Sequence, residues 1–482
     1  MTIKKFFKDF IFYGINGIIG KLLALVTLPI ITSIFNPGDY GVIETITASI
    51  ALLPLLLGLG YDMSIKKMVL VAAAKDEKKI SNIVSTIFWF LIFWGGVITL
   101  ILVLLSTPIS VLMFKNDLYS HAVKLSFINV FIALLYGFEL TMLRVYFQSK
   151  KYTIINTGYT VLNYILVIVF IAIMKLGISG YFYAMSISAF FTFALTFFFI
   201  KKDIKLYFDL KILKSVLSFG IPVLTASLAY WIFNLSDRLV LTRMSNPTET
   251  GLYSMGIKIT SIVPFVVMAF REAWVPRAYQ MYQEDKEKFP AILNKVHQYT
   301  LVAFGIIGML NMAGAKFLLN VLSTRSFYES YMLMSPLIYA NILFPLTYVG
   351  SIGIYISNKP KYISYLSWVS AILNLGLNIV LVPVIGALSA SMTTAISYLV
   401  LYLSYWFYSA KLMKWKLSFA KPLITLGILA TYFVLTQFIN YDNIVLDVAV
   451  KTALMLVYIL ILFLFKLCSI ADIKKLLHKG GT

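Results

Sequence analysis

Several long apolar segments of this sequence carry charged side chains, and these residues have the types best suited to chemistry. A charge surrounded by hydrocarbon needs an oppositely charged partner or a water-filled cavity, because leaving water is otherwise costly. The bases among them are Lys21, Arg144, Arg238, Lys258 and Arg271, and the acids are Glu44, Glu139 and Asp237. They predict a polar site inside an apolar molecule, where the available chemistry is ion pairing and the binding of charged groups.

Each of these charges also has a structural interpretation. Arg144 and Arg271 lie near the ends of their apolar segments, where a long side chain can reach the membrane interface. Asp237 and Arg238 are neighbours and can form an ion pair that braces the fold. Lys21 and Lys258 lie deeper in their segments, so for these two lysines we favour a role in a cavity.

Metal-binding and catalytic patterns are close to absent from the sequence. His121, His297 and His478 have no second histidine or carboxylate at helical ligand spacing, so we expect solvated or interfacial histidines. Cys468 is the single cysteine, which excludes an internal disulfide. No G-x-x-x-x-G-K-(S/T) nucleotide loop is present. We therefore expect no metal, no cofactor and no enzymatic activity.

The elements that must position these charges are apolar helices. Hydrophobic residues make up 60% of the chain and charged residues only 13%, too few to cover a soluble surface. Apolar runs of about 20 residues, the length that spans a bilayer, recur along the chain. We predict an all-α polytopic membrane protein with about fourteen transmembrane helices at 10–34, 41–61, 82–105, 122–143, 153–174, 178–200, 215–241, 251–272, 297–321, 331–356, 362–384, 386–409, 421–439 and 446–466.

Basic residues divide unevenly between the joints that connect these segments. Most of the 41 lysines and arginines fall in every second joint or near the chain ends, among them Lys75, Lys474, Lys475 and Lys479. The positive-inside rule then places those joints and both termini in the cytoplasm. The net charge of +21 reflects this topology and attraction to anionic lipid, so we expect no nucleic-acid partner.

Two landmarks recur in the same order, roughly 210 residues apart, which is typical of an internal duplication. The first is a turn of the form Asn-Pro-x-(Asp/Glu)-x-Gly, found at 36–41 and again at 246–251. The second is an asparagine within an apolar run, Asn163 in the first half and Asn374 in the second. The duplication predicts two six-helix lobes that share one scaffold.

The duplication also gives boundaries. We predict an N-lobe at 1–200, a C-lobe at 201–410, and a C-terminal helix pair with a basic tail at 411–482. The charges are not repeated between the lobes, because Glu44 falls opposite Ser254 in the aligned halves. Shared scaffold and unshared charges indicate an asymmetric site.

A further set of motifs lies in the middle of the chain and consists of Phe219-Gly-Ile-Pro222, Trp231, Ser236-Asp-Arg238 and Gly251-Leu-Tyr-Ser254. This set resembles the middle signature of bacterial polysaccharide flippases of the Wzx type, in the multidrug/oligosaccharidyl-lipid/polysaccharide (MOP) exporter superfamily. The turn at 36–41, Phe270-Arg-Glu-Ala-Trp-Val-Pro276 and the stretch from Asn374 to Gly386 are also similar to the family. The resemblance covers nearly the whole chain.

The resemblance implies a transporter in the bacterial plasma (inner) membrane, with two lobes facing a central cavity. Its cargo would be an undecaprenyl-pyrophosphate-linked oligosaccharide, moved from the cytoplasmic to the outer leaflet by alternating access. Lys21, Arg238 and Lys258 would supply counter-charge for the pyrophosphate, with Arg144 and Arg271 as further candidates. The acids would couple transport to protons or cations, and these are Glu44, Glu139 and Asp237. We expect a monomer that meets polysaccharide polymerase or assembly proteins.

Two other functions stay open at this point. The first is a multidrug, cation-coupled efflux pump of the same superfamily, which we expect to hold buried acids rather than lysines. The second is a membrane-embedded glycan polymerase or ligase, a class that tends to carry a large outer loop, whereas no joint here exceeds about 25 residues. The residues leave the glycan open between O-antigen, capsule, exopolysaccharide and teichoic-type polymers.

Overall fold

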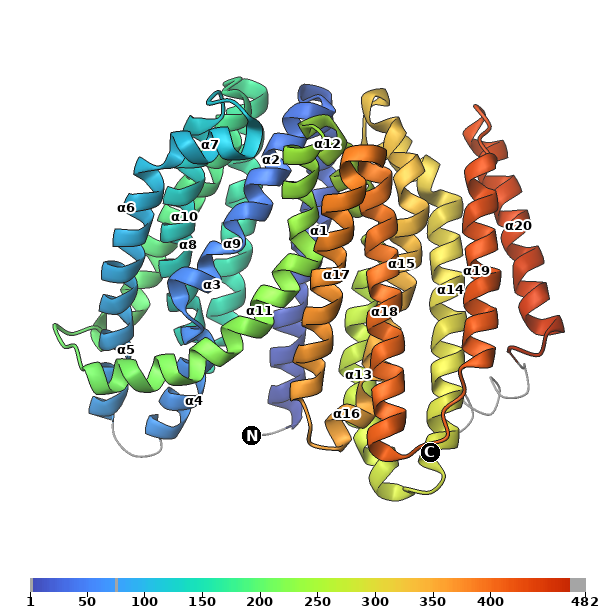
Figure 1. The fold of residues 1–482 in the computed structure, drawn as a ribbon. Helices are drawn as coiled ribbons and strands as arrows, with labels where there is room; N and C mark the ends of the chain where they lie inside the picture. Colours follow the sequence, from blue (N-terminus) through green and yellow to red (C-terminus); the bar gives the residue numbers. More distant parts are fainter. Residues whose placement is uncertain (1–2, 74–76, 469–482) are drawn as a thin grey trace. The chain divides into compact units, whose positions relative to one another are not determined.

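The computed structural model describes residues 3–73 and 77–468, and every regular element in these ranges is a helix (Figure 1). For residues 3–18, 67, 70–73, 77–78, 223, 226 and 265 only the backbone is described. Lys75, His478 and the tail residues Lys474, Lys475 and Lys479 lie outside the described residues. The all-α prediction is confirmed.

The predicted spans coincide with helices of the structure. Within the described residues, 11 helices are long and apolar enough to cross a membrane, and up to 13 if each of two bent pairs is one span. Helix α1 covers the predicted first span, and its stretch Ile19–Ile34 is a shorter apolar helix. The prediction of a polytopic membrane protein is therefore confirmed.

The chain divides into two compact units, of which unit 1 comprises Met1–Gly251. Its helices are α1 (Ile3–Ile34), α2 (Pro37–Ile50), α3 (Leu53–Gly58), α4 (Tyr61–Ala73), α5 (Glu77–Phe90), α6 (Gly96–Leu104), α7 (Ser106–Phe114), α8 (Ser120–Val145), α9 (Ser149–Ile168), α10 (Gly177–Ile200) and α11 (Leu210–Met244). Short π-helical turns η1 (Leu91–Gly95) and η2 (Val169–Ile173) follow α5 and α9, and a 3₁₀ turn η3 (Lys201–Asp203) follows α10.

Unit 2 comprises Leu252–Thr482. Helix α12 (Pro247–Thr260) begins just before it and continues into it, and the 3₁₀ turn η4 (Arg325–Ser330) lies between α14 and α15. The other helices are α13 (Ile262–Glu284), α14 (Phe289–Leu322), α15 (Tyr331–Gly350), α16 (Ile352–Ile356), α17 (Lys361–Ile385), α18 (Ala387–Met413), α19 (Ala420–Phe438) and α20 (Ile444–Leu464).

The same helix pairings recur inside each unit, as a duplication requires. In unit 1, α10 packs against α8 and α9 (Figure 1). Phe138 of α8 and Phe182 of α10 are fully buried in the core of this unit. In unit 2, α18 packs against α15 and α17 in the corresponding order, while α19 and α20 pack against α14. The predicted lobe boundaries stay a prediction, because the two compact units are defined by contacts between residues, whereas the lobes are defined by the sequence repeat.

Two spans are bent rather than straight. Helix α11 turns by 53° between its parts Leu210–Pro222 and Ser227–Met244, and α12 meets α13 at 41°. Pro222 lies at the α11 bend, where proline removes a backbone donor and its ring crowds the preceding turn. The second part of α11 packs along α2, which brings the charges of these two helices together.

The two Asn-Pro turns have the same geometry and touch each other. The Oδ1 atoms of Asn36 and Asn246 accept hydrogen bonds from the backbone N–H groups of Asp39 (3.0 Å) and Glu249 (2.9 Å). A Cβ atom on Gly41 would collide with the carbonyl oxygen of Pro247, and one on Gly251 would collide with that of Pro37. This reciprocal contact between equivalent residues relates the two turns by a local twofold arrangement.

We expect the substitution Gly41→Ala to destabilise the protein by about 1–3 kcal/mol, because two backbones would have to separate to admit one methyl group. The matched control is Gly158→Ala on α9, where a new Cβ meets nothing within 4 Å. In the control, alanine should be neutral or stabilising by about 0.5–1 kcal/mol. Melting temperatures of the purified proteins compare the two, and equal melting temperatures would contradict the close contact.

Candidate functional site

Three of the predicted site residues form one buried ion cluster in unit 1. Arg238 of α11 lies with its Nε 3.7 Å from Glu44 Oε2 of α2 and its Nη1 3.4 Å from Asp237 Oδ1. The same Nη1 donates to the backbone oxygen of Asn234 at 3.0 Å. The exposed fractions of the three side chains are 9% for Arg238, 13% for Glu44 and 3% for Asp237. One arginine thus faces two carboxylates in a largely water-free place.

Neutral hydrogen bonds fix the helices that carry this cluster. The Thr45 hydroxyl lies 2.5 Å from that of Thr242, which lies 2.8 Å from that of Thr250. One turn further along α2, the Trp231 indole donates to the backbone oxygen of Ala48 at 2.9 Å. Both contacts follow Glu44 along α2, at the next residue and about one turn further on, so the cluster is held on a rigid support.

Arg144 belongs to a second cluster at the end of α8. Its Nη2 lies 3.8 Å from Asp62 Oδ1 and donates to the Thr141 hydroxyl at 3.1 Å. Lys66 pairs with the same Asp62 at 2.5 Å, and the Arg144 guanidinium lies 5.1 Å from the centre of the Tyr152 ring. The side chains of Arg144 and Asp62 are 38% and 41% exposed, so this cluster is far more open than the first.

Glu139 stands apart from both clusters, in the interior of unit 1. The carboxyl group is fully buried on α8 and accepts a short hydrogen bond from Thr196 of α10 through Oε2. Its Oε1 has no hydrogen-bond partner among the described residues. A buried carboxyl with an open acceptor is suited to taking up a proton or a cation.

The three remaining predicted residues are more exposed. Lys21 has an exposed side chain on α1 in unit 1, and Lys258 is half-buried on α12 in unit 2. Arg271 is exposed on α13, with its guanidinium 5.2 Å from the centre of the Tyr348 ring. The structure therefore joins Glu44, Asp237 and Arg238 within unit 1.

The sequence predictions did not include a second buried ion pair, Asp447 and Lys451 on α20. Both side chains are 0% exposed and form a short salt bridge, and Lys451 Nζ lies 4.5 Å from the centre of the Tyr331 ring. The signal was present in the sequence, because an acid followed by a base four residues later faces it on a helix. The predicted span began at 446, which made Asp447 look like a terminal residue.

His297 corrects the expectation of a solvated or interfacial histidine. The ring is 0% exposed in unit 2 and stacks on Trp406, with ring centroids 3.9 Å apart. His121 is exposed as expected and lies 2.8 Å from the Tyr183 hydroxyl. His297 was misjudged because its sequence position near a span end does not tell which side of α14 faces the core.

No group of three or more His, Cys, Asp or Glu side chains is arranged to hold a metal ion within the part of the chain that the structure describes.

Comparison with solved structures shows which known fold this chain shares. An inward-facing multidrug resistance MATE family transporter of the MOP superfamily matches with a TM-score of 0.69 and 14% identity, covering 82% of this chain and 94% of that one. The lipid II flippase MurJ in an inward closed conformation matches with a TM-score of 0.68 and 14% identity, covering 96% of this chain and all of that one. At this identity the likeness concerns the fold, which is the fold of MOP superfamily transporters.

The chain belongs to the polysaccharide biosynthesis protein family, whose model matches residues 6–282. The membrane protein MJ1068 of Methanocaldococcus jannaschii is 21% identical over 283 residues, which are 57% of this chain and 55% of that protein. A protein of the Lsg locus of Haemophilus influenzae is 24% identical over 92 residues, 19% of this chain and 22% of that protein. The matched region thus spans about half the length of the Methanocaldococcus jannaschii protein and about a fifth of the length of the Haemophilus influenzae protein. The chain is thus a multi-pass membrane protein of the polysaccharide biosynthesis protein family, and its fold is that of the MOP superfamily transporters it matches.

Proposed function

We propose that this protein moves a polyprenyl-pyrophosphate-linked oligosaccharide, the repeat unit of a polysaccharide, from the cytoplasmic to the outer leaflet. The observation that carries the proposal is the family match, because it joins a polysaccharide role to a transporter fold. The polyprenyl chain can stay in the lipid while the head group crosses. Only the pyrophosphate and the sugars then need a polar path.

The charged residues have definite roles in this proposal. A pyrophosphate entering an apolar interior needs cations, because burying an uncompensated anion is prohibitive. We assign that counter-charge to Lys21, Arg238 and Lys258, with Arg144 and Arg271 guiding the anion at the more exposed positions. The pyrophosphate of the cargo and the carboxylates of Glu44 and Asp237 would compete for the single guanidinium group of Arg238.

That competition offers a way to couple transport to an ion. When the cargo takes Arg238, the carboxylates of Glu44 and Asp237 lose the charge of Arg238, and the uptake of protons or another cation would replace it. When the cargo leaves, the ion cluster forms again and releases the coupling ion. Glu139 is the third candidate for this coupling, through its open carboxyl oxygen.

The proposal includes a location and an organisation. The protein would lie in the bacterial inner membrane with both termini in the cytoplasm, as the distribution of basic residues indicates. The lobes at 1–200 and 201–410 would enclose the path in alternating-access states. We propose a monomer that hands its cargo to polysaccharide assembly proteins.

A second candidate function, efflux of cationic drugs, is favoured by the acid excess of the buried groups in unit 1. Glu44 and Asp237 together outnumber Arg238, and Glu139 adds another buried acid. This candidate predicts raised drug tolerance in cells that produce the protein. We expect unchanged tolerance, measured as growth in serial dilutions of cationic dyes and antiseptics.

The test of the proposed function is complementation. A bacterial strain that lacks its polysaccharide flippase should regain surface glycan when it produces this chain. We expect Lys21→Ala and Lys258→Ala each to lower that glycan by about tenfold or more, because each removes a counter-charge worth at least 1.4 kcal/mol to the anion. Protein amounts in the membrane should not change.

Two matched variants control this experiment. Lys21→Arg keeps the charge and should retain surface glycan, and Lys124→Ala removes an exposed lysine of α8 without effect. Normal glycan in both alanine variants would remove Lys21 and Lys258 from the mechanism. The proposed function would be contradicted if the unmodified chain restored glycan in none of four flippase-deficient strains, one for each of the four polymer types.

A further inference from the structure

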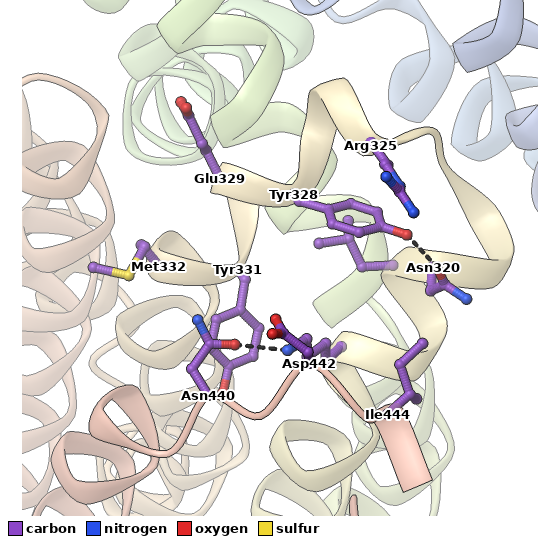
Figure 2. A pocket seen from close by; sticks show the side chains of 11 residues that line it. Asn320, Arg325, Tyr328, Glu329, Tyr331, Met332, Asn440, Asp442 and Ile444 are labelled. Carbon is purple, nitrogen blue, oxygen red and sulfur yellow. Dashed lines mark hydrogen bonds between the residues drawn. The ribbon is translucent and has the colours of Figure 1, made fainter. Parts of the chain in front are cut away.

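Unit 2 contains a pocket whose lining combines charged, amide and apolar side chains, and none of the predicted site residues lines it. Its volume is about 680 Å³, and it lies between the α14–α15 connection and the loop that joins α19 to α20. Figure 2 shows Arg325, Tyr328 and Asn320 on one side and Asn440 and Asp442 on the other. The volume falls within the range of about 300–1,000 Å³ that is usual for small-molecule sites.

The loop between α19 and α20 forms one wall of the pocket and is held in place by charge-assisted hydrogen bonds. Lys316 of α14 donates to Asn440 Oδ1 at 2.7 Å and to the backbone oxygen of Tyr441 at 2.5 Å. The backbone N–H of Tyr441 in turn donates to Asp447 Oδ1 at 3.2 Å. Because Asp447 is itself paired with the buried Lys451, the loop is tied to the interior of the unit.

The aromatic side of the pocket is equally well fixed. The Tyr328 hydroxyl donates a short hydrogen bond to Asn320 Oδ1, so the orientation of its half-buried ring is set. Tyr331 is buried with its ring over Lys451 Nζ, and its hydroxyl donates to the backbone oxygen of Thr436 at 3.2 Å. The pocket is thus preorganised, which lowers the entropy cost of binding.

The lining points to an uncharged, hydroxyl-rich ligand. Two bases, Lys316 and Arg325, are balanced by two acids, Glu329 and Asp442, so the pocket has no net charge that would favour an anion. Planar amide, carboxylate and guanidinium groups offer donors and acceptors side by side, as a polyol requires. The half-buried ring of Tyr328 offers an apolar face to the C–H surface of a sugar ring.

We propose that this pocket binds a sugar residue. The inference deepens the proposed function and rests on it: on the predicted topology the pocket opens at the outer side of the membrane, where it would hold the glycan after crossing. The binding itself follows from the pocket and is testable without transport. A sugar can come from the lipid-linked cargo or from free glycan, and both share the chemistry that the lining recognises.

The experiment measures sugar binding by the full-length purified protein. The probes are free glucose, galactose and N-acetylglucosamine, and their binding is detected by saturation-transfer NMR. The protein is kept in an amine-oxide detergent, because a detergent with a sugar head group would itself occupy the pocket. We expect at least one sugar to bind, and Tyr328→Ala and Arg325→Ala to weaken that binding by about tenfold or more. Absence of binding by all three sugars would overturn the proposal.

Matched variants separate this pocket from other surfaces. Tyr365→Ala removes a tyrosine that is 62% exposed on α17, and Arg243→Ala removes an exposed arginine at the end of α11. Both should bind sugar as the unmodified protein does. Equal binding by the pocket variants and these controls would also overturn the proposal.

Complementation distinguishes failure of this inference from failure of the proposed function. If the unmodified chain restores surface glycan but the pocket variants bind sugar as well as it does, the sugar site is contradicted and the flippase proposal is not. Specific sugar binding in a chain that restores no glycan supports the site and defeats the flippase proposal. An undecaprenyl-linked saccharide added to the NMR sample should compete with the free sugar if the cargo is its source.

Discussion

Replacing Arg238 with methionine is expected to destabilise the protein by about 3–5 kcal/mol, the cost of removing one partner from a buried ion pair. Glu44 and Asp237 would then both lose the charge of Arg238, at exposed side-chain fractions of only 13% and 3%. The measurement is the melting temperature of the purified protein together with its amount in the membrane. Arg243→Met, an exposed arginine on the same helix, should leave both unchanged.

A triple variant separates the contribution of the ion cluster to stability from the role of Arg238 in binding the cargo. It combines Glu44→Gln, Asp237→Asn and Arg238→Met. Removing all three charges takes away both acids together with the base that lies beside them, so the melting temperature should return close to that of the unmodified protein. Surface glycan should stay low, because the cargo has lost a cation. A melting temperature unchanged by Arg238→Met would contradict the ion cluster. Normal glycan in the triple variant would exclude Arg238 from the cargo path.

Local rules made the helical framework predictable from the sequence. Runs of apolar residues of bilayer length mark spans regardless of how these spans pack, and the predicted ranges coincide with the helices found. Asn36 and Asn246 were recognised as repeated turns because an Asn-Pro cap acts within a few residues of its own position. Pro222 likewise bends α11 where a proline inside a helix should.

Contacts between distant segments were not predictable from one sequence. Arg238 meets Glu44 because α11 folds back along α2, and no local pattern tells which helix of the other half α2 will touch. The same limit applies to the reciprocal contact of Gly41 and Gly251, although both glycines had been aligned as repeats. His297 was misjudged because its ring packs on Trp406 from a different helix.

The depth of a charge along a helix was predictable, but the direction in which it points was not. Lys21 was placed well inside its segment, and its side chain is exposed on α1. Glu139 was placed near a span end and is fully buried against α10. Sequence position fixes the height of a residue in the membrane, whereas burial depends on which neighbours cover that face of the helix.

The buried pair on α20 gives the other large expected effect. Lys451→Met should destabilise the protein by about 3–5 kcal/mol, because Asp447 would be left fully buried with no cation beside it. The loss should appear as a lower melting temperature and less protein in the membrane. Lys421→Met, which removes an exposed lysine of α19, is the matched control and should melt like the unmodified protein.

The double variant Asp447→Asn, Lys451→Met tests the physical reason for that loss. The Asn side chain keeps an acceptor for the Tyr441 N–H, which Asp447 Oδ1 now accepts at 3.2 Å, while both charges are gone. Since neutral replacement of a whole buried pair is often tolerated, the double variant should regain most of the stability that the single variant loses. If the double variant is as unstable as Lys451→Met alone, the loss comes from the packing of the lysine stem against Tyr331 and not from the orphaned carboxylate.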